Sequence, residues 1–79
     1  MSRTLDTRRH EALRAFMVER RKIAGLRQVD LAKRLGRSQS YVSYIEIGQK
    51  HVALIELIEW AEAIGFDPEE AITEISKIK

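Results

Sequence analysis

The sequence contains no cysteine and only two histidines among its 79 residues. Without cysteine the chain can form neither disulfides nor thiolate-bound metal sites, and His10 and His51 alone argue against a histidine-based zinc site. We therefore expect no metal and no cofactor. The lack of cysteine also fits a reducing compartment such as the cytoplasm.

Long apolar runs are missing as well. No stretch approaches the roughly 20 apolar residues that span a bilayer. Charged side chains interrupt the amino-terminal segment at Asp6, Arg8, Arg9 and Glu11, where a secretory signal would carry its apolar centre. These absences predict a soluble, cytoplasmic protein that makes no contact with a membrane.

Catalytic motifs are absent too. The sequence has no Gly-x-Ser-x-Gly segment, and its four glycines are dispersed rather than gathered into a phosphate-binding loop. A chain of this length forms one domain, expected over residues 1–79, and buries roughly 60% of its unfolded surface. So small a domain offers little concave space for a substrate, and we do not expect an enzyme.

The charges that are present divide unevenly along the chain. Residues 1–40 contain eleven lysines and arginines against four aspartates and glutamates, a net charge of 11 − 4 = +7. Residues 41–79 contain three against eight, a net charge of 3 − 8 = −5. A basic half suggests an anionic partner such as nucleic acid. The alternative is that these charges only keep a small domain soluble.

Apolar residues recur at helical spacing along the chain, and alternation with a period of two is rare. The sequence therefore predicts an all-α fold, a bundle of five helices. Capping and stop residues give the bounds. The expected helices start at Asp6 or Thr7 and stop at Gly25, run from Gln28 to Leu35, from Gln39 to Ile47 and from about residue 54 to Gly65, and begin again at Pro68.

One face of each expected helix is apolar. In the fifth helix, Asp67 is the expected cap, Pro68 takes the first helical position and Glu70 is placed to return a capping bond. The predicted apolar positions are Leu13, Phe16, Met17, Ile23 and Ala24, then Leu31, Ala32 and Leu35, then Val42 and Ile45, then Leu54, Leu57, Ile58, Ala61 and Ile64, and finally Ala71, Ile72, Ile75 and Ile78.

The third expected helix has an outward side without charge. At 100° per residue, Val42 and Ile45 fall on its inner side. The outer side carries Gln39, Ser40, Ser43, Tyr44 and Ile47. An amide, hydroxyls and a phenol both donate and accept hydrogen bonds, as contacts with base edges in a major groove require. The alternatives are an ordinary polar face or a face that contacts another protein.

The surrounding segment reads GLRQVDLAKRLGRSQSYVSYIEIGQK. It carries a recurrent pattern at Gln28, Leu31, Ala32, Gly36, Ser38, Val42, Ser43, Glu46 and Gly48. Together with the apolar residues of the fourth helix, residues 21–66 resemble the helix-turn-helix family of phage repressors, Cro proteins and Xre-type regulators. The resemblance implies a repressor-like bundle whose helix-turn-helix covers about residues 28–47.

The resemblance also implies roles for single residues. It assigns base contacts to Gln39, Ser40, Ser43 and Tyr44, and DNA phosphate contacts to Gln28, Arg27, Ser38, Arg37 and Lys50. A glutamine amide can pair with adenine N6 and N7, so Gln39 is the foremost candidate. Arg21 and Glu46 correspond to the family's internal ion pair. Two residues depart from the family, since Arg27 stands where a Ser or Thr cap is usual and Ile47 where a polar residue is frequent.

These features predict a sequence-specific DNA-binding transcriptional regulator, a repressor, whose partner is double-stranded DNA. Because one helix contacts few base pairs, we expect a homodimer joined by the stripe of Ile72, Ile75 and Ile78. The stripe would instead complete the domain's own core if the fifth helix folds back. The alternative function is a protein-interaction module, in its sharpest form an antitoxin whose surface binds a partner toxin.

Overall fold

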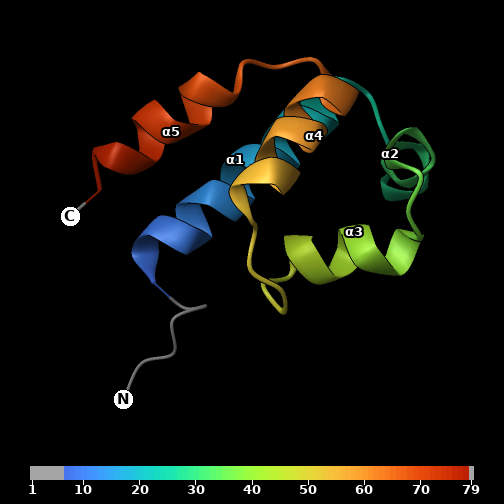
Figure 1. Cartoon of the computed structure of the whole chain (residues 1–79), viewed down its shortest axis with the longest axis horizontal. Helices are drawn as coiled ribbons and strands as arrows, with labels where there is room; N and C mark the ends of the chain where they lie inside the picture. The colour runs from blue at the N-terminus through green and yellow to red at the C-terminus, as the bar shows by residue number, and fades with distance from the viewer. Residues whose placement is uncertain (1–6, 79) are drawn as a thin grey trace.

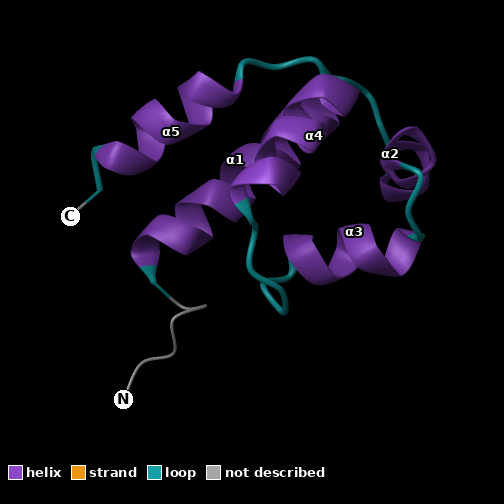
Figure 2. Cartoon of the chain, in the orientation of Figure 1, coloured by secondary structure: helices purple, strands orange, loops and turns teal. Residues whose placement is uncertain are grey.

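The computed structural model describes residues 7–78 and contains only helices within that range (Figures 1 and 2). The five helices are α1 (Arg8–Ile23), α2 (Gln28–Leu35), α3 (Gln39–Glu46), α4 (Leu54–Ile64) and α5 (Pro68–Ser76). The predicted all-α, five-helix fold is therefore confirmed. Among the described residues, no helix is long and apolar enough to cross a membrane.

Side-chain caps fix where three of the helices begin. The hydroxyl of Thr7 accepts a hydrogen bond from the backbone N–H of His10 at 3.1 Å, and the hydroxyl of Ser38 accepts one from the N–H of Tyr41 at 3.2 Å. At α5, a carboxylate oxygen of Asp67 accepts from the N–H of Glu69 at 2.9 Å. These bonds satisfy N–H groups that have no partner inside the helix.

The turn between α2 and α3 depends on a left-handed residue. Gly36 has φ +68° and ψ +32°, a conformation that a side chain disfavours, and its N–H bonds back to the last turn of α2. Ser38 then starts α3 two residues later. The predicted bounds of α2 are thus confirmed, and α3 ends one residue before the predicted Ile47, which is its C-cap.

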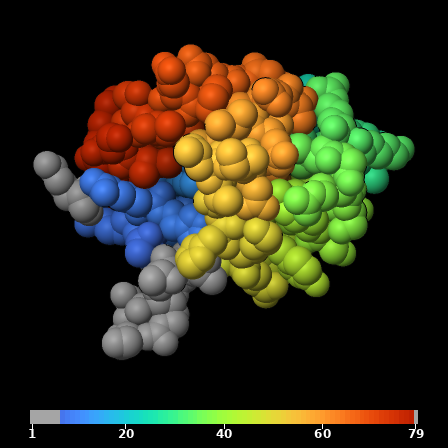
Figure 3. All heavy atoms as spheres, viewed as in Figure 1, coloured from blue at the N-terminus to red at the C-terminus, as the bar shows by residue number. Residues whose placement is uncertain are grey.

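Helix α4 lies across the middle of the molecule with α1 behind it (Figure 1). Helices α2 and α3 pack on each other and on this central pair, while α5 packs mainly on α1. In the space-filling view, α5 and the α2–α3 segment occupy opposite ends of the visible face (Figure 3). The helix-turn-helix is therefore held at one end of the bundle, away from α5.

The core draws on every helix. The largest fully buried side chains are Trp60, Met17, Leu31, Ile45 and Val42, and Ala71 of α5 is fully buried as well. Two edge-to-face aromatic pairs extend this core, Phe16 with Phe66 and Tyr41 with Trp60, at ring-centre distances of 5.4 and 6.4 Å. Trp60 thus joins α4 to the inner flank of α3.

Four predicted core positions in α1 and α4 are wrong, and one of them is Ala24, the exposed C-cap of α1. Ile23 at the last turn of α1 is 72% exposed, Leu54 at the start of α4 is 62% exposed and Ile58 is 36% exposed. The inward side of α4 instead carries Leu57, Trp60, Ala61 and Ile64, together with Glu56. The large ring of Trp60 has more apolar surface to bury than Leu54 or Ile58, so α4 is rotated to place Trp60 inside.

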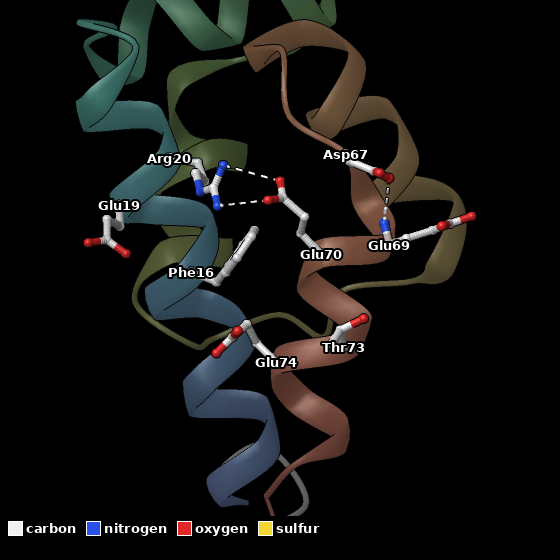
Figure 4. Close-up of a pocket in the computed structure, with 8 residues that line it drawn as sticks. All are labelled: Phe16, Glu19, Arg20, Asp67, Glu69, Glu70, Thr73 and Glu74. Carbon is white, nitrogen blue, oxygen red and sulfur yellow. Dashed lines mark hydrogen bonds and ion pairs between the residues drawn. The ribbon is translucent and has the colours of Figure 1, made fainter.

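Helix α5 differs from its prediction in two respects. The carboxylate of Glu70 does not return a capping bond but pairs with the guanidinium of Arg20 on α1 at 3.3 and 3.5 Å (Figure 4). The burial of two isoleucines also differs, because Ile72, expected in the core, is 47% exposed, whereas Ile78, expected to be exposed, is half-buried and lies near Ala12 and Ala15 of α1. The register of α5 on α1 decides which isoleucine is covered.

Candidate nucleic-acid interface

Helix α3 turns one side into the core and the other outward. Val42 and Ile45 are fully buried, and Glu46, the charged residue of α3, keeps its side chain only 6% exposed. The outward side carries the four predicted base-contacting residues, of which only Ser43 is half-buried: Gln39, Ser40, Ser43 and Tyr44. The surface of α3 therefore offers hydrogen-bond donors and acceptors without a formal charge.

A buried ion pair fixes the angle of α3. Arg21 of α1 donates from Nε to Glu46 Oε2 at 2.7 Å and from Nη2 to Glu46 Oε1 at 3.1 Å. Its third group, Nη1, donates to the backbone carbonyl of Leu26 at 2.7 Å. Gln28 of α2 adds a bond from Nε2 to Glu46 Oε1 at 2.8 Å. One carboxylate thus connects α1, α2 and α3.

Gln28 therefore has a structural contact that the resemblance did not imply. One of its two amide N–H groups is bound to Glu46, so the second N–H is the side-chain donor left for a phosphate. The backbone N–H groups of the first turn of α2 are further donors at this position. A phosphate contact at Gln28 would use these groups.

Arg27 stands at the N-cap of α2 but forms no side-chain cap bond there, because a guanidinium has no acceptor. Asp30 accepts from the Arg27 backbone N–H at 2.9 Å and from its guanidinium at 3.0 and 2.9 Å. The guanidinium bond and the backbone N–H bond from Arg27 lower the pKa of Asp30 from its ordinary 3.8 to about 2. The carboxylate of Asp30, in the first turn of α2, thus accepts from the N–H of the N-cap residue Arg27. The guanidinium of Arg27, a predicted phosphate contact, is already paired with this carboxylate.

The two predicted cations beside α3 have different surroundings. Arg37, in the turn before α3, is exposed and places its guanidinium carbon 4.3 Å from the centre of the Tyr41 ring. Lys50, in the loop after α3, donates from Nζ to both carboxylate oxygens of Glu56 at 3.2 and 3.0 Å. The predicted contact Ser38 lies next to Arg37 and uses its hydroxyl oxygen as the α3 cap.

Three residues behind this surface were not predicted as part of the site. Tyr41 donates its hydroxyl to Glu56 Oε2 at 2.9 Å and accepts from Trp60 Nε1 at 3.4 Å. Glu56 also accepts from the backbone N–H of Ala53 at 2.9 Å. The spacing of Ala53 and Glu56 is that of a helix cap and a returning glutamate, so the sequence did contain a signal for Glu56.

Acidic side chains gather at the other end of the molecule. Glu19 of α1 and Glu69, Glu70 and Glu74 of α5 line the groove between these helices, with Phe16 and Arg20 between them (Figure 4). Within residues 7–78, no group of three histidine or acidic side chains could hold a metal ion. Four of the eight acidic residues in residues 41–79 thus lie on α5 or at its cap, away from α3: Asp67, Glu69, Glu70 and Glu74.

A patch of exposed apolar residues lies on α4 and α5. Leu54 and Ile72 line one groove of about 370 Å³, together with Leu13 and Ile75. Ile58 follows Leu54 by one turn of α4 and is also exposed. We call Leu54, Ile58 and Ile72 the α4–α5 patch.

Comparisons with known proteins agree with this architecture. A family model described as a helix-turn-helix domain matches residues 1–71. The structure is similar to an XRE-family like protein from Pseudomonas syringae pv. tomato str. DC3000, at 35% sequence identity and a TM-score of 0.84, with 90% of this chain and 87% of that chain covered. It is also similar to the clp gene regulator ClgR from C. glutamicum, at 26% identity and a TM-score of 0.79, with 91% and 94% covered. A comparison with curated proteins gave no match.

The family match spans both helices of the predicted helix-turn-helix and the helices that support them. The similarity to the XRE-family like protein extends over nearly the whole described fold. The resemblance inferred from the sequence pattern is confirmed, and the chain belongs to the Xre-type helix-turn-helix family.

Proposed function

We propose that this protein is a sequence-specific, DNA-binding repressor that inserts α3 into the major groove. The observation that carries the proposal is the outward side of α3, which combines an amide, hydroxyls and a phenol with no charge on a rigidly held helix. Groups that donate and accept at a fixed spacing can distinguish base pairs in the major groove, about 12 Å wide, whereas a face built for solubility would be charged.

The contacts divide into two kinds. Gln39, Ser40, Ser43 and Tyr44 face the bases, with Gln39 as the bidentate partner of adenine. Arg37, the Ser38 segment and the first turn of α2 at Gln28 lie around α3 and contact phosphates. Arg27 and Lys50 are at the same surface, but each already holds a carboxylate. A regulator of this kind works where the chromosome is, which is the basis for proposing a cytoplasmic location.

A second copy of the chain completes the DNA-binding unit in this proposal. A single α3 spans too few base pairs to define one site in a genome, and regulators of this type place two such helices one DNA turn apart. The α4–α5 patch supplies three large exposed apolar side chains for a two-fold contact, and it replaces the predicted stripe because Ile75 and Ile78 are partly covered by their own domain.

Selection of bound sequences from random duplex DNA tests the proposal. We expect one preferred site with two related halves, and an affinity that falls with salt at a slope of about −0.9 per phosphate contact in a double-logarithmic plot. A protein that selects no sequence and whose binding ignores salt would refute the proposal.

The alternative, an antitoxin, makes a different prediction. A basic partner protein would bind the acidic groove between α1 and α5, where Glu19, Glu69 and Glu74 lie (Figure 4). Charge reversal at Glu69 and Glu74 would then abolish the protein complex, whereas it should leave the preferred DNA site unchanged. Co-expression with the products of adjacent genes, followed by purification of the tagged chain, distinguishes the two functions.

A further inference from the structure

Two cations lie at the two ends of α3, and the side chain of Tyr41 lies near both. The guanidinium carbon of Arg37 is 4.3 Å from the Tyr41 ring centre, and Lys50 Nζ is 6.0 Å from it. Their partners differ. No carboxylate within residues 7–78 forms an ion pair with Arg37, whereas Lys50 is paired with Glu56.

The Tyr41 ring is held in place from behind. Its hydroxyl donates to Glu56 and accepts from the indole N–H of Trp60, whose side chain is fully buried. Burial raises the pKa of Tyr41, which keeps the hydroxyl protonated and able to donate. A ring held by two hydrogen bonds has a fixed face, and a guanidinium stacked on that face keeps its N–H edges available.

Lys50 is committed to a different contact. All three of its N–H donors have partners, the two oxygens of Glu56 and the backbone carbonyl of His51 at 3.4 Å. Glu56 is only 8% exposed, so moving Lys50 to a phosphate would leave a buried carboxylate without its cation. Burial raises the pKa of Glu56, but the bonds from Ala53, Lys50 and Tyr41 outweigh it and the pKa lies below its ordinary value.

We propose that Tyr41 is a positioning residue that orients Arg37 toward a DNA phosphate, while Lys50 is a latch that ties the loop after α3 to Glu56 and contributes no phosphate contact. This inference rests on the proposed function, because it takes the outward side of α3 as the DNA-binding side. A pre-oriented guanidinium loses less side-chain freedom on binding, and its edge matches two phosphate oxygens. The Lys50–Glu56 ion pair holds the loop after α3 against the start of α4, and it adds no net charge to the DNA-binding surface.

The salt dependence of DNA affinity separates the two roles. The wild-type protein, Arg37→Ala and the charge-matched double variant Lys50→Met with Glu56→Gln are titrated with the selected duplex at several salt concentrations. We expect Arg37→Ala to reduce the steepness of the salt slope by about 0.9, the value of one phosphate contact. The double variant keeps the net charge, and its slope should equal that of the wild type.

Two variants of Tyr41 test the positioning. Tyr41→Phe keeps the ring and loses the hydroxyl, whereas Tyr41→Leu loses the ring. We expect Tyr41→Leu to weaken binding to specific and non-specific DNA alike by about two- to fivefold, the value of an exposed cation–π contact, and to make the further change Arg37→Ala less costly than it is in the wild type. Tyr41→Phe should stay close to the wild type, and melting curves show which variants are folded.

A readout in the free protein makes the test independent of DNA. Side-chain protons of Arg37 should carry upfield ring-current shifts in the NMR spectrum that persist in Tyr41→Phe and vanish in Tyr41→Leu. A double variant that loses about 0.9 of the slope, or an Arg37→Ala variant that keeps all of it, overturns the inference. A wild-type protein that does not bind DNA refutes the proposed function itself, a result distinct from either of these.

Discussion

Arg21 of α1 and Glu46 of α3 form a bidentate ion pair, with Nε–Oε2 and Nη2–Oε1 distances of 2.7 and 3.1 Å. Their side chains are only 10% and 6% exposed, so each charge is stabilised by the other charge in place of water. Because the same carboxylate also accepts from Gln28, the pair sets the position of α3 relative to both helices that support it.

We predict that Glu46→Ala lowers the free energy of unfolding by ~3–5 kcal/mol, because it leaves the buried Arg21 charge uncompensated. Urea unfolding followed by circular dichroism measures the loss. Glu70→Ala is the matched control, since it breaks the exposed pair with Arg20 and should cost ~0–1 kcal/mol. The double variant Arg21→Met with Glu46→Leu should be more stable than Glu46→Ala, and equal losses for Glu46→Ala and Glu70→Ala would contradict the assignment.

A second prediction concerns pH and the cap of α2. The folded pKa of Asp30, about 2, lies below its ordinary 3.8, so the ionised form is favoured by folding. The stability advantage of the wild type over Asp30→Asn should therefore be complete above about pH 4 and vanish as the pH falls through about 2. Melting temperatures of both proteins across this range check it.

Arg27→Ala serves as the control for this pH dependence. It removes the guanidinium but keeps the backbone N–H that also bonds Asp30, so it should lose only part of the acid-sensitive stability. A wild-type advantage that is unchanged at pH 2 would show that the Asp30 bonds do not stabilise α2.

The third prediction addresses the choice of base. Gln39→Ala should cost ~1–3 kcal/mol of binding free energy on the preferred duplex and almost nothing on unrelated DNA, because a bidentate base contact acts only at its own base pair. Competition titrations with the preferred and a scrambled duplex give both values. Thr73→Ala on α5, exposed and far from α3, is the control and should change neither. An unaltered site preference in Gln39→Ala would remove Gln39 as the discriminating residue.

The fourth prediction concerns assembly. We expect the wild-type protein to sediment as a dimer at tens of micromolar, and Leu54→Glu with Ile72→Glu to sediment as a folded monomer, because two charges would then face each other across the two-fold contact. Ile23→Glu is the control, since Ile23 is 72% exposed but lies on α1 outside the α4–α5 patch. It should remain dimeric. A wild-type protein that is monomeric both free and on DNA would contradict the proposed dimer.

The sequence by itself determined the helices and the helix-turn-helix. Thr7, Ser38 and Asp67 cap their helices through bonds that span only two or three residues, and Gly36 ends α2 through its own backbone conformation. Such local interactions depend on neighbours along the chain, so a pattern of residue types is enough to predict them. The uncharged outer side of α3 followed in the same way, once Val42 and Ile45 were identified as its inner side.

The tertiary structure decided which side of each amphipathic helix is covered and which charges meet. Periodicity predicted an apolar stripe on α4 but not the rotation of the helix relative to the core. Burial of Trp60 leaves Leu54 and Ile58 facing outward. The sequence pattern did not indicate that Glu70 would pair with Arg20 instead of capping α5. It also did not indicate that Lys50 would pair with Glu56. Arg20 and Glu70 meet because α5 packs on α1, and Lys50 reaches Glu56 because the loop after α3 leads back to the first turn of α4. Only the assembled bundle fixes these distances.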